Sequence, residues 1–156
     1  GEQFTSACLI DPLSLLAIRA TAPLAPLHNP ANLMGIRALA ALAPDLAQYA
    51  SFDTAFHASN PALATTYALP AAERARGLRR YGFHGLSYAS MVRRLRPNLP
   101  RRLLGLHLGN GASLCAILDG KSVATTMGHS PQDGLIMGTR AGTIDSAAVR
   151  SRLSPL

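Results

Sequence analysis

The sequence contains no tryptophan, 5% aromatic residues in total, two cysteines and one lysine, Lys121, among its 15 basic residues. Cys8 and Cys115 lie far apart and in no metal-ligand spacing. This excludes a disulfide framework and a cysteine-based zinc site, and it favours a reducing compartment. No apolar stretch reaches the roughly 18 residues that a membrane-spanning helix needs. We therefore expect neither a structural disulfide nor insertion into a membrane.

Acidic residues are also scarce. Eight Asp and Glu stand against 15 Lys and Arg, which gives a formal net charge of +7. A basic chain suits nucleic acid, an anionic membrane or a small anionic ligand. The basic runs at 74–82, 93–97 and 100–104 lack interleaved aromatics and match no nucleic-acid-binding module. We expect these runs to be solvated surfaces, with one or two arginines that bind a small anion, and we expect no nucleic-acid partner.

The chain has 156 residues, of which 48% are hydrophobic, and this is enough for a packed core. Alanine- and leucine-rich segments alternate with short apolar runs, a pattern that indicates an α/β fold. The spacing of apolar residues predicts a helix over 31–44, and Ser87 is a candidate N-cap of a later helix. A further helix is expected to start near Asp145, and no strand is expected at the N-terminus. Strands are predicted at 46–52, 103–108, 112–118 and 122–126, with a hairpin turn at Asp119-Gly120.

The bend "HLGNGAS" begins at His107 and interrupts two of these strands at Gly109, Asn110 and Gly111. Glycine exposes backbone N–H groups without a Cβ in the way, and successive amides can form a nest for an anion. A plain hairpin turn is the alternative. The spacing matches neither the dinucleotide fingerprint nor the Walker phosphate loop. His107 favours an anion site, because an imidazole donor beside bare amides suits phosphate oxygens.

Three other residues lie at positions that suggest a catalytic or binding role. Asp53 follows a predicted strand, where carboxylates often line α/β active sites, although it could equally cap a helix that continues through His57. His84 lies in a glycine-bounded loop, "YGFHG", and Arg140 lies between glycines in "MGTRAG". An arginine aimed at a phosphate is one interpretation of Arg140, and an exposed loop arginine is the other.

Five blocks in chain order, "LAPLHNPANLMGI", "FDTAFH", "RRYGFHG", "HLGNGASLCAILDGKSV" and "MGHSPQDGLIMGTRAGTID", closely resemble the signature blocks of the acetate kinase family. Propionate kinases share most of them. The resemblance implies part of an actin-like (ribonuclease H-like) two-domain α/β kinase fold, with a β-hairpin region in the last third of the chain. It places residues 1–98 in the first domain and residues 99–156 at the start of the second, nucleotide-phosphate-binding domain.

The same resemblance implies reversible transfer of the γ-phosphoryl group of ATP to acetate, which gives acetyl phosphate and ADP. It also implies that the reaction uses Mg²⁺ and that the protein forms a homodimer. It further implies a cytoplasmic location and a role in acetate metabolism and acetyl-CoA biosynthesis. Asp53 then corresponds to the active-site aspartate, and His84 and Arg140 correspond to the two transition-state stabilisers. The ATP phosphate segment corresponds to His107, Leu108, Gly109, Asn110 and Gly111. Pro61 and the segment around His28 correspond to the cleft wall, and no residue is assigned as a metal ligand.

The chain also departs from the family pattern. Leu86 and Tyr88 stand where threonine and histidine are usual, and Thr143 and Ser146 stand where aspartate and proline are usual. The family's N-terminal phosphate turn, a substrate-binding arginine, the adenosine pocket and a Mg²⁺-binding glutamate have no counterpart here. We therefore expect an internal fragment that is poorly active alone. The alternatives are a propionate kinase, or an inactive truncated remnant that at most binds nucleotide phosphate.

Overall fold

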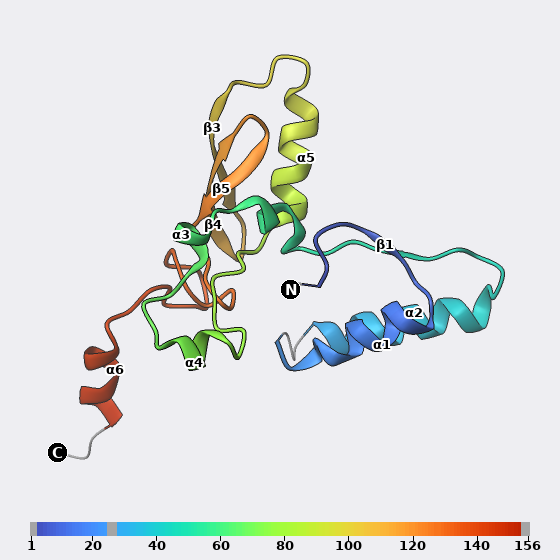
Figure 1. The fold of residues 1–156 in the computed structure, drawn as a ribbon, viewed down its shortest axis with the longest axis horizontal. Helices are drawn as coiled ribbons and strands as arrows, with labels where there is room; N and C mark the ends of the chain where they lie inside the picture. The colour runs from blue at the N-terminus through green and yellow to red at the C-terminus, as the bar shows by residue number, and fades with distance from the viewer. Residues whose placement is uncertain (1–2, 25–27, 154–156) are drawn as a thin grey trace.

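A computed structural model describes residues 3–24 and 28–153. In it a helical hairpin lies beside a helix-covered β-sheet, and the last helix extends away from both (Figure 1). The elements in chain order are β1 (Cys8–Leu9), α1 (Pro12–Ala20), η1 (Ala22–Leu24), α2 (Asn29–Leu42), β2 (Tyr49–Ala50), η2 (Ala55–Ser59), α3 (Ala62–Thr65), α4 (Ala71–Arg74), α5 (Gly85–Leu95), β3 (Arg102–Leu108), β4 (Ala112–Leu118), β5 (Lys121–Thr125) and α6 (Ser146–Leu153).

The N-terminal hairpin owes its start to local sequence. Asp11 accepts a hydrogen bond from the Ser14 N–H at 2.7 Å, and the Ser14 hydroxyl accepts one from the Asp11 N–H at 2.8 Å. This capping box gives partners to two backbone N–H groups that have none within the helix α1. The expectation of no N-terminal strand is wrong, because β1 pairs antiparallel with β2. A ladder of two residues per strand is too short to show an alternating pattern. The helices and this ribbon enclose a small core of Phe4, Ile18 and Leu33.

The three-stranded antiparallel sheet has the order β3-β4-β5. Its β3–β4 register runs from Arg102 opposite Leu118 to Leu108 opposite Ala112. Asp119 and Gly120 both have positive φ, +50° and +78°, as a tight two-residue hairpin requires. The three strands predicted in this part of the chain are confirmed to within one residue at each end, and so is the turn.

Helix α5 covers one face of this sheet (Figure 1). Tyr88 and Val92 of the helix pack with Cys115 and Ile117 of β4, and Tyr88 and Cys115 have no exposed surface. Cys115 is therefore a core residue of this part of the molecule. This core joins residues on both sides of the domain boundary predicted at 98/99, and that boundary stays a prediction.

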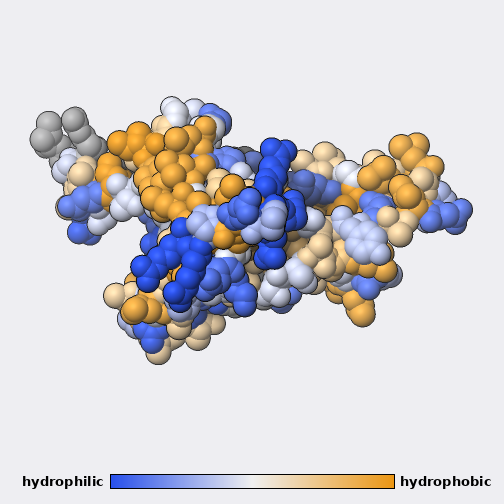
Figure 2. All heavy atoms as spheres, turned by 90° about the horizontal axis from the view of Figure 1, so that it is seen from above, coloured by the Kyte–Doolittle hydropathy of each residue, from blue (hydrophilic) through white to orange (hydrophobic). Residues whose placement is uncertain are grey.

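The opposite face of the sheet carries exposed leucines. Leu104, Leu106 and Leu108 of β3 are 60%, 50% and 70% exposed. Apolar side chains are also exposed elsewhere on the molecule, and Figure 2 shows hydrophobic patches separated by hydrophilic side chains on one face. Among the described residues, no helix has both the length and the apolar character needed to cross a bilayer.

Three other local predictions need correction. Of the strand expected at 46–52, only the two residues of β2 are found. The residues on either side of β2 take no part in its antiparallel pairing with β1. The helix expected after Asp53 is the single short 3₁₀ helix η2. Ser87 does not cap α5: the cap position is His84, with left-handed backbone at φ 62° and ψ 20°. The start of α6 at Ser146 agrees with the helix start expected near Asp145.

Candidate active site

Asp53 and His84 meet at the N-terminus of α5. The His84 N–H donates to Asp53 Oδ2 at 2.7 Å, and the Leu86 N–H lies 3.5 Å from Oδ1. The Gly85 N–H donates to the Asp53 carbonyl at 2.8 Å, and a Cβ on Gly85 would overlap that carbonyl. Asp53 therefore caps α5 from a distant part of the chain, and the helix dipole favours its negative charge. Its capping role was anticipated, but for the wrong helix.

His107 and Arg140 join this pair. The imidazole rings of His84 and His107 stack with their centroids 3.9 Å apart and 17° between their planes. Arg140 is held by a hydrogen bond from Nη1 to the Pro131 carbonyl at 2.7 Å. A Cβ built on Gly111 would lie 2.8 Å from Arg140 Nη2 and 3.0 Å from His84 Nε2. Gly111 thus lets both side chains approach the turn closely, because a larger residue at this position would collide with them.

The glycine turn uses only part of its backbone N–H groups for its own hydrogen bonds. The Gly109 N–H is used within the turn, because it donates to the Gly111 carbonyl at 3.0 Å. In the described part of the chain, the N–H groups of Asn110 and Gly111 have no backbone acceptor. The Leu108 side chain lies on the far, exposed face of the sheet, so this residue can contribute only its backbone to the site.

The electrostatics favour a neutral His84. Burial lowers its pKa below the usual 6.5, and the neighbouring His107 and Arg140 lower it further, while Asp53 acts in the opposite direction. A neutral imidazole keeps one N–H donor and one acceptor. His84 can therefore donate a hydrogen bond at neutral pH without adding a positive charge beside Arg140.

The sequence pattern included His57 only in a helix that Asp53 could cap, and the structure gives this residue another role. Its ring is 2% exposed, with Nε2 2.9 Å from the Phe83 carbonyl and Nδ1 2.8 Å from the Ser122 hydroxyl. Burial lowers its pKa. Because a carbonyl only accepts, Nε2 carries the proton and the neutral ring accepts from Ser122 through Nδ1. His57 thereby fixes the backbone just before His84.

Sequence reasoning did not identify Ser113 as part of the site. Its hydroxyl lies 2.9 Å from His84 Nδ1 and 2.5 Å from the Tyr88 hydroxyl, and neither Ser113 nor Tyr88 is exposed. The available signal was a polar residue at an inward position of β4, in register with His107. His28, before α2, and Pro61, before α3, make no hydrogen bond or ring contact with this cluster in the described part of the chain.

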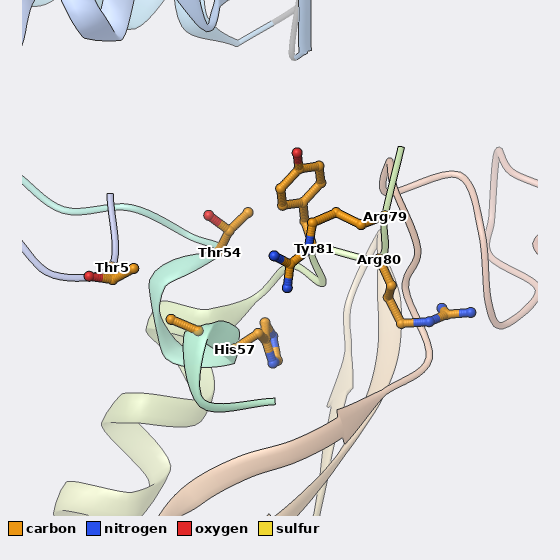
Figure 3. Close-up of a pocket in the computed structure, with 7 residues that line it drawn as sticks. Thr5, Thr54, His57, Arg79, Arg80 and Tyr81 are labelled. Atoms are coloured by element: carbon orange, nitrogen blue, oxygen red, sulfur yellow. The ribbon is translucent and has the colours of Figure 1, made fainter. Parts of the chain in front are cut away.

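A cavity of about 130 Å³ lies next to the cluster, lined by Thr5, Thr54, His57, Ala58, Arg79, Arg80 and Tyr81. In Figure 3 the Arg79 side chain extends toward Thr54 and His57, whereas Arg80 points away from them. Arg80 instead donates to the carbonyls of Thr126 and Met127. The cavity shares the 53–57 segment with the cluster, but its lining includes neither His84 nor Arg140.

The residues described here do not form a cage for Mg²⁺. No group of three or more His, Cys, Asp or Glu side chains that could hold a metal ion occurs among residues 3–24 and 28–153. Asp53 is the carboxylate of the cluster, and both its oxygens lie at backbone N–H groups of α5. A magnesium ion usually needs one or two carboxylates that are free to ligate it.

Comparison with solved structures defines the class of fold. The chain superposes with a TM-score of 0.93 on acetate kinase from Entamoeba histolytica, at 35% identity over 98% of this chain and 41% of that one. It superposes with a TM-score of 0.91 on a propionate kinase from Francisella tularensis, at 42% identity over 97% of this chain and 40% of that one. The fold is therefore α/β and forms part of the actin-like kinase architecture of these enzymes.

The sequence comparisons identify the family. A model of the Acetokinase family matches residues 1–152, and the chain belongs to that family. It is 50% identical to acetate kinase from Deinococcus radiodurans in an alignment of 151 residues that covers 93% of this chain and 38% of that protein. The chain thus spans about two fifths of the length of this curated relative.

Proposed function

We propose that this chain supplies the phosphoryl-transfer residues of an acetate kinase, which reversibly transfers the γ-phosphoryl group of ATP to acetate. One observation carries the proposal. His84 Nε2 and Arg140 Nη2 come together against the glycine turn, where both lie close to Gly111. Each of these groups is a hydrogen-bond donor, which is what the equatorial oxygens of a transferring phosphoryl group require.

The proposed mechanism needs no strong base. Acetate, with a pKa of roughly 4–5 as for other carboxyl groups, is ionised at neutral pH and attacks without losing a proton. Catalysis then consists of positioning the reactants and stabilising charge on the moving phosphoryl group. Arg140 and His84 donate to its equatorial oxygens, while the Asn110 and Gly111 amides and His107 hold the ATP phosphates. Removing one such donor typically costs about 3–4 kcal/mol of transition-state stabilisation.

We assign Asp53 a role through His84. Its carboxylate caps the helix that His84 begins, so it orients the His84 backbone and adds negative charge near the ring. The hydrogen bonding of Asp53 gives no support to a role in organising Mg²⁺, because both its oxygens lie at backbone N–H groups. We propose that the ion enters with the phosphates of ATP, and we assign no step to it.

Acetate is preferred over propionate as the proposed acceptor, because the curated relative at 50% identity is an acetate kinase. The propionate kinase structure at 42% identity keeps propionate as the second candidate. We propose a cytoplasmic location and a place in acetate metabolism by analogy with the family. A homodimer, and the absence of nucleic-acid and membrane partners, are likewise proposals.

The test is a chimaera in which the 151 aligned residues of this chain replace their counterpart in the Deinococcus radiodurans enzyme. Acyl phosphate is trapped as the hydroxamate, with acetate or propionate as acceptor. We expect turnover in the chimaera, and a fall of about 10²–10³ in kcat for Arg140→Ala with little change in the KM for ATP. The matched control is Arg76→Ala, because that side chain is 73% exposed and pairs with the nearby Glu73.

An Arg140→Ala chimaera that retains full turnover would refute the proposed role of Arg140. A chimaera that folds and binds ATP but transfers no phosphate to either acid would support the truncated remnant instead. Binding of RNA that weakens steeply with salt, without phosphotransfer, would support a nucleic-acid function.

A further inference from the structure

Tyr88 forms the far end of a buried hydrogen-bond chain that leads to His84. The Tyr88 and Ser113 hydroxyls are 2.5 Å apart, and Ser113 Oγ is 2.9 Å from His84 Nδ1. Neither Tyr88 nor Ser113 has exposed surface, so bulk water does not compete for these bonds. These hydrogen bonds therefore connect the core under α5 to the imidazole ring of His84, which faces the site.

The direction of the hydrogen bonds from Tyr88 to His84 follows from which groups can donate and which can accept. Among the described residues, Ser113 Oγ is the acceptor that lies within reach of the Tyr88 O–H, and a buried hydroxyl proton needs an acceptor. The Tyr88 O–H then donates to Ser113, the Ser113 O–H donates to His84 Nδ1, and the proton of a neutral His84 must lie on Nε2. The opposite direction would leave the Tyr88 O–H to find another buried acceptor.

The packing holds Tyr88 in this position. Gly105 of β3 gives room for its ring, because a Cβ there would lie 3.0 Å from Tyr88 Cδ1. The rings of Phe56 and His57 lie against it, with centroids 6.3 and 5.8 Å away. Burial raises the pKa of Tyr88, so the hydroxyl keeps the proton that it donates.

We propose that Tyr88 is a positioning residue, which acts through Ser113 to hold His84 as the Nε2–H tautomer. His84 then presents a donor at the point beside Gly111 and Arg140. The other tautomer would direct a nitrogen lone pair at negatively charged phosphoryl oxygens, which is repulsive. The catalytic consequence rests on the proposed function, whereas the tautomer itself does not.

The test reads the tautomer in the complete 156-residue chain by ¹⁵N NMR of the imidazole nitrogens, with His84 assigned through His84→Asn. In the wild type we expect Nε2 of His84 to carry the proton. Tyr88→Phe keeps the ring but removes the donor to Ser113, and the ratio of Nε2–H to Nδ1–H should fall about fivefold. The matched control, Tyr81→Phe, removes a hydroxyl bonded to the Gly77 carbonyl at 3.0 Å and should leave the ratio unchanged.

A wild-type His84 that carries its proton on Nδ1 would overturn the proposal, even if Tyr88→Phe failed to fold. A folded Tyr88→Phe chain with an unchanged ratio would overturn it as well. Ser113→Ala should shift the ratio by itself, and adding Tyr88→Phe to it should have no further effect.

Activity is measured separately in the chimaera. There Tyr88→Phe should lower kcat by no more than about fivefold, with the KM for ATP unchanged. If the chimaera without any substitution were inactive, the proposed function would fail while the tautomer result would stand.

Discussion

Two histidine–serine pairs lie on the same face of the sheet. They differ in the partner of the second ring nitrogen, Nε2. His57 Nδ1 meets Ser122 of β5 at 2.8 Å, and His84 Nδ1 meets Ser113 of β4 at 2.9 Å. The Nε2 atom of His57 is bound by the Phe83 carbonyl. The Nε2 atom of His84 instead lies beside Arg140 Nη2, next to Gly111 of the glycine turn.

The difference shows how one residue type serves two purposes. His57 has both nitrogens satisfied by the protein and is 2% exposed, so it has no bonding capacity left for a ligand. His84 keeps one nitrogen available beside an arginine. The structure therefore predicts that substitutions at His57 lower stability, and that substitutions at His84 lower turnover.

The largest expected effect is on turnover at His84. In the chimaera, His84→Asn should lower kcat about 10²–10³-fold, because one transition-state donor is lost. Asparagine tolerates the left-handed backbone found here but leaves the buried Ser113 hydroxyl without its acceptor, so the free energy of unfolding should fall by about 1 kcal/mol. Steady-state kinetics and urea unfolding measure the two quantities. If His84→Asn lost stability but kept its turnover, the assignments of the two histidines would have to be exchanged.

The next effect is on stability at His57. His57→Ala should lower the free energy of unfolding by about 3 kcal/mol, because it leaves a cavity and unpaired groups at Ser122 and Phe83. In the chimaera the folded fraction should keep its turnover to within about tenfold. His129→Ala is the control, since that ring is only partly buried and its Nδ1 lies 3.2 Å from a carbonyl. An equal loss of stability in both variants would contradict the distinction.

The sequence alone was sufficient for the hairpin and for the loops of the site. The hairpin strands were predictable because short apolar runs flank the Asp119-Gly120 turn, which has a strong signature. The glycines beside His84, Gly111 and Arg140 identified the loops of the site, because glycine marks close approach of backbone and side chain.

The hydrogen bonds between these loops were not predictable. Asp53 caps a helix that begins 32 positions later, and Tyr88 reaches Ser113 across 25 positions. Short motifs carry no information on such pairings. Ser87 was favoured as a cap because serine has that propensity, but the left-handed His84 and the Asp53 carboxylate took over the role.

A smaller effect is the pH dependence of stability. Burial lowers the pKa of His57 in the folded chain, whereas the unfolded residue titrates near 6.5. Above that pH both states are neutral, and below it only the unfolded state gains the proton. The free energy of unfolding should therefore fall by about 1 kcal/mol between pH 7 and 5.5. His57→Gln should flatten this slope in urea unfolding, and an unchanged slope would show that other groups cause it.

The smallest effect is expected at Cys115, whose Sγ lies 3.2 Å from Ser122 Oγ at the inner end of the His57 chain. A thiol is a weak donor, so Cys115→Ala should cost only about 1 kcal/mol. Ser122 keeps its bond to His57 in that variant. Burial also raises the pKa of the Cys115 thiol, so it should react with a thiol reagent only on unfolding, whereas the partly exposed Cys8 reacts in the folded chain. Equal reaction of both thiols in the folded protein would mean that the surroundings of Cys115 and His57 are open to the reagent.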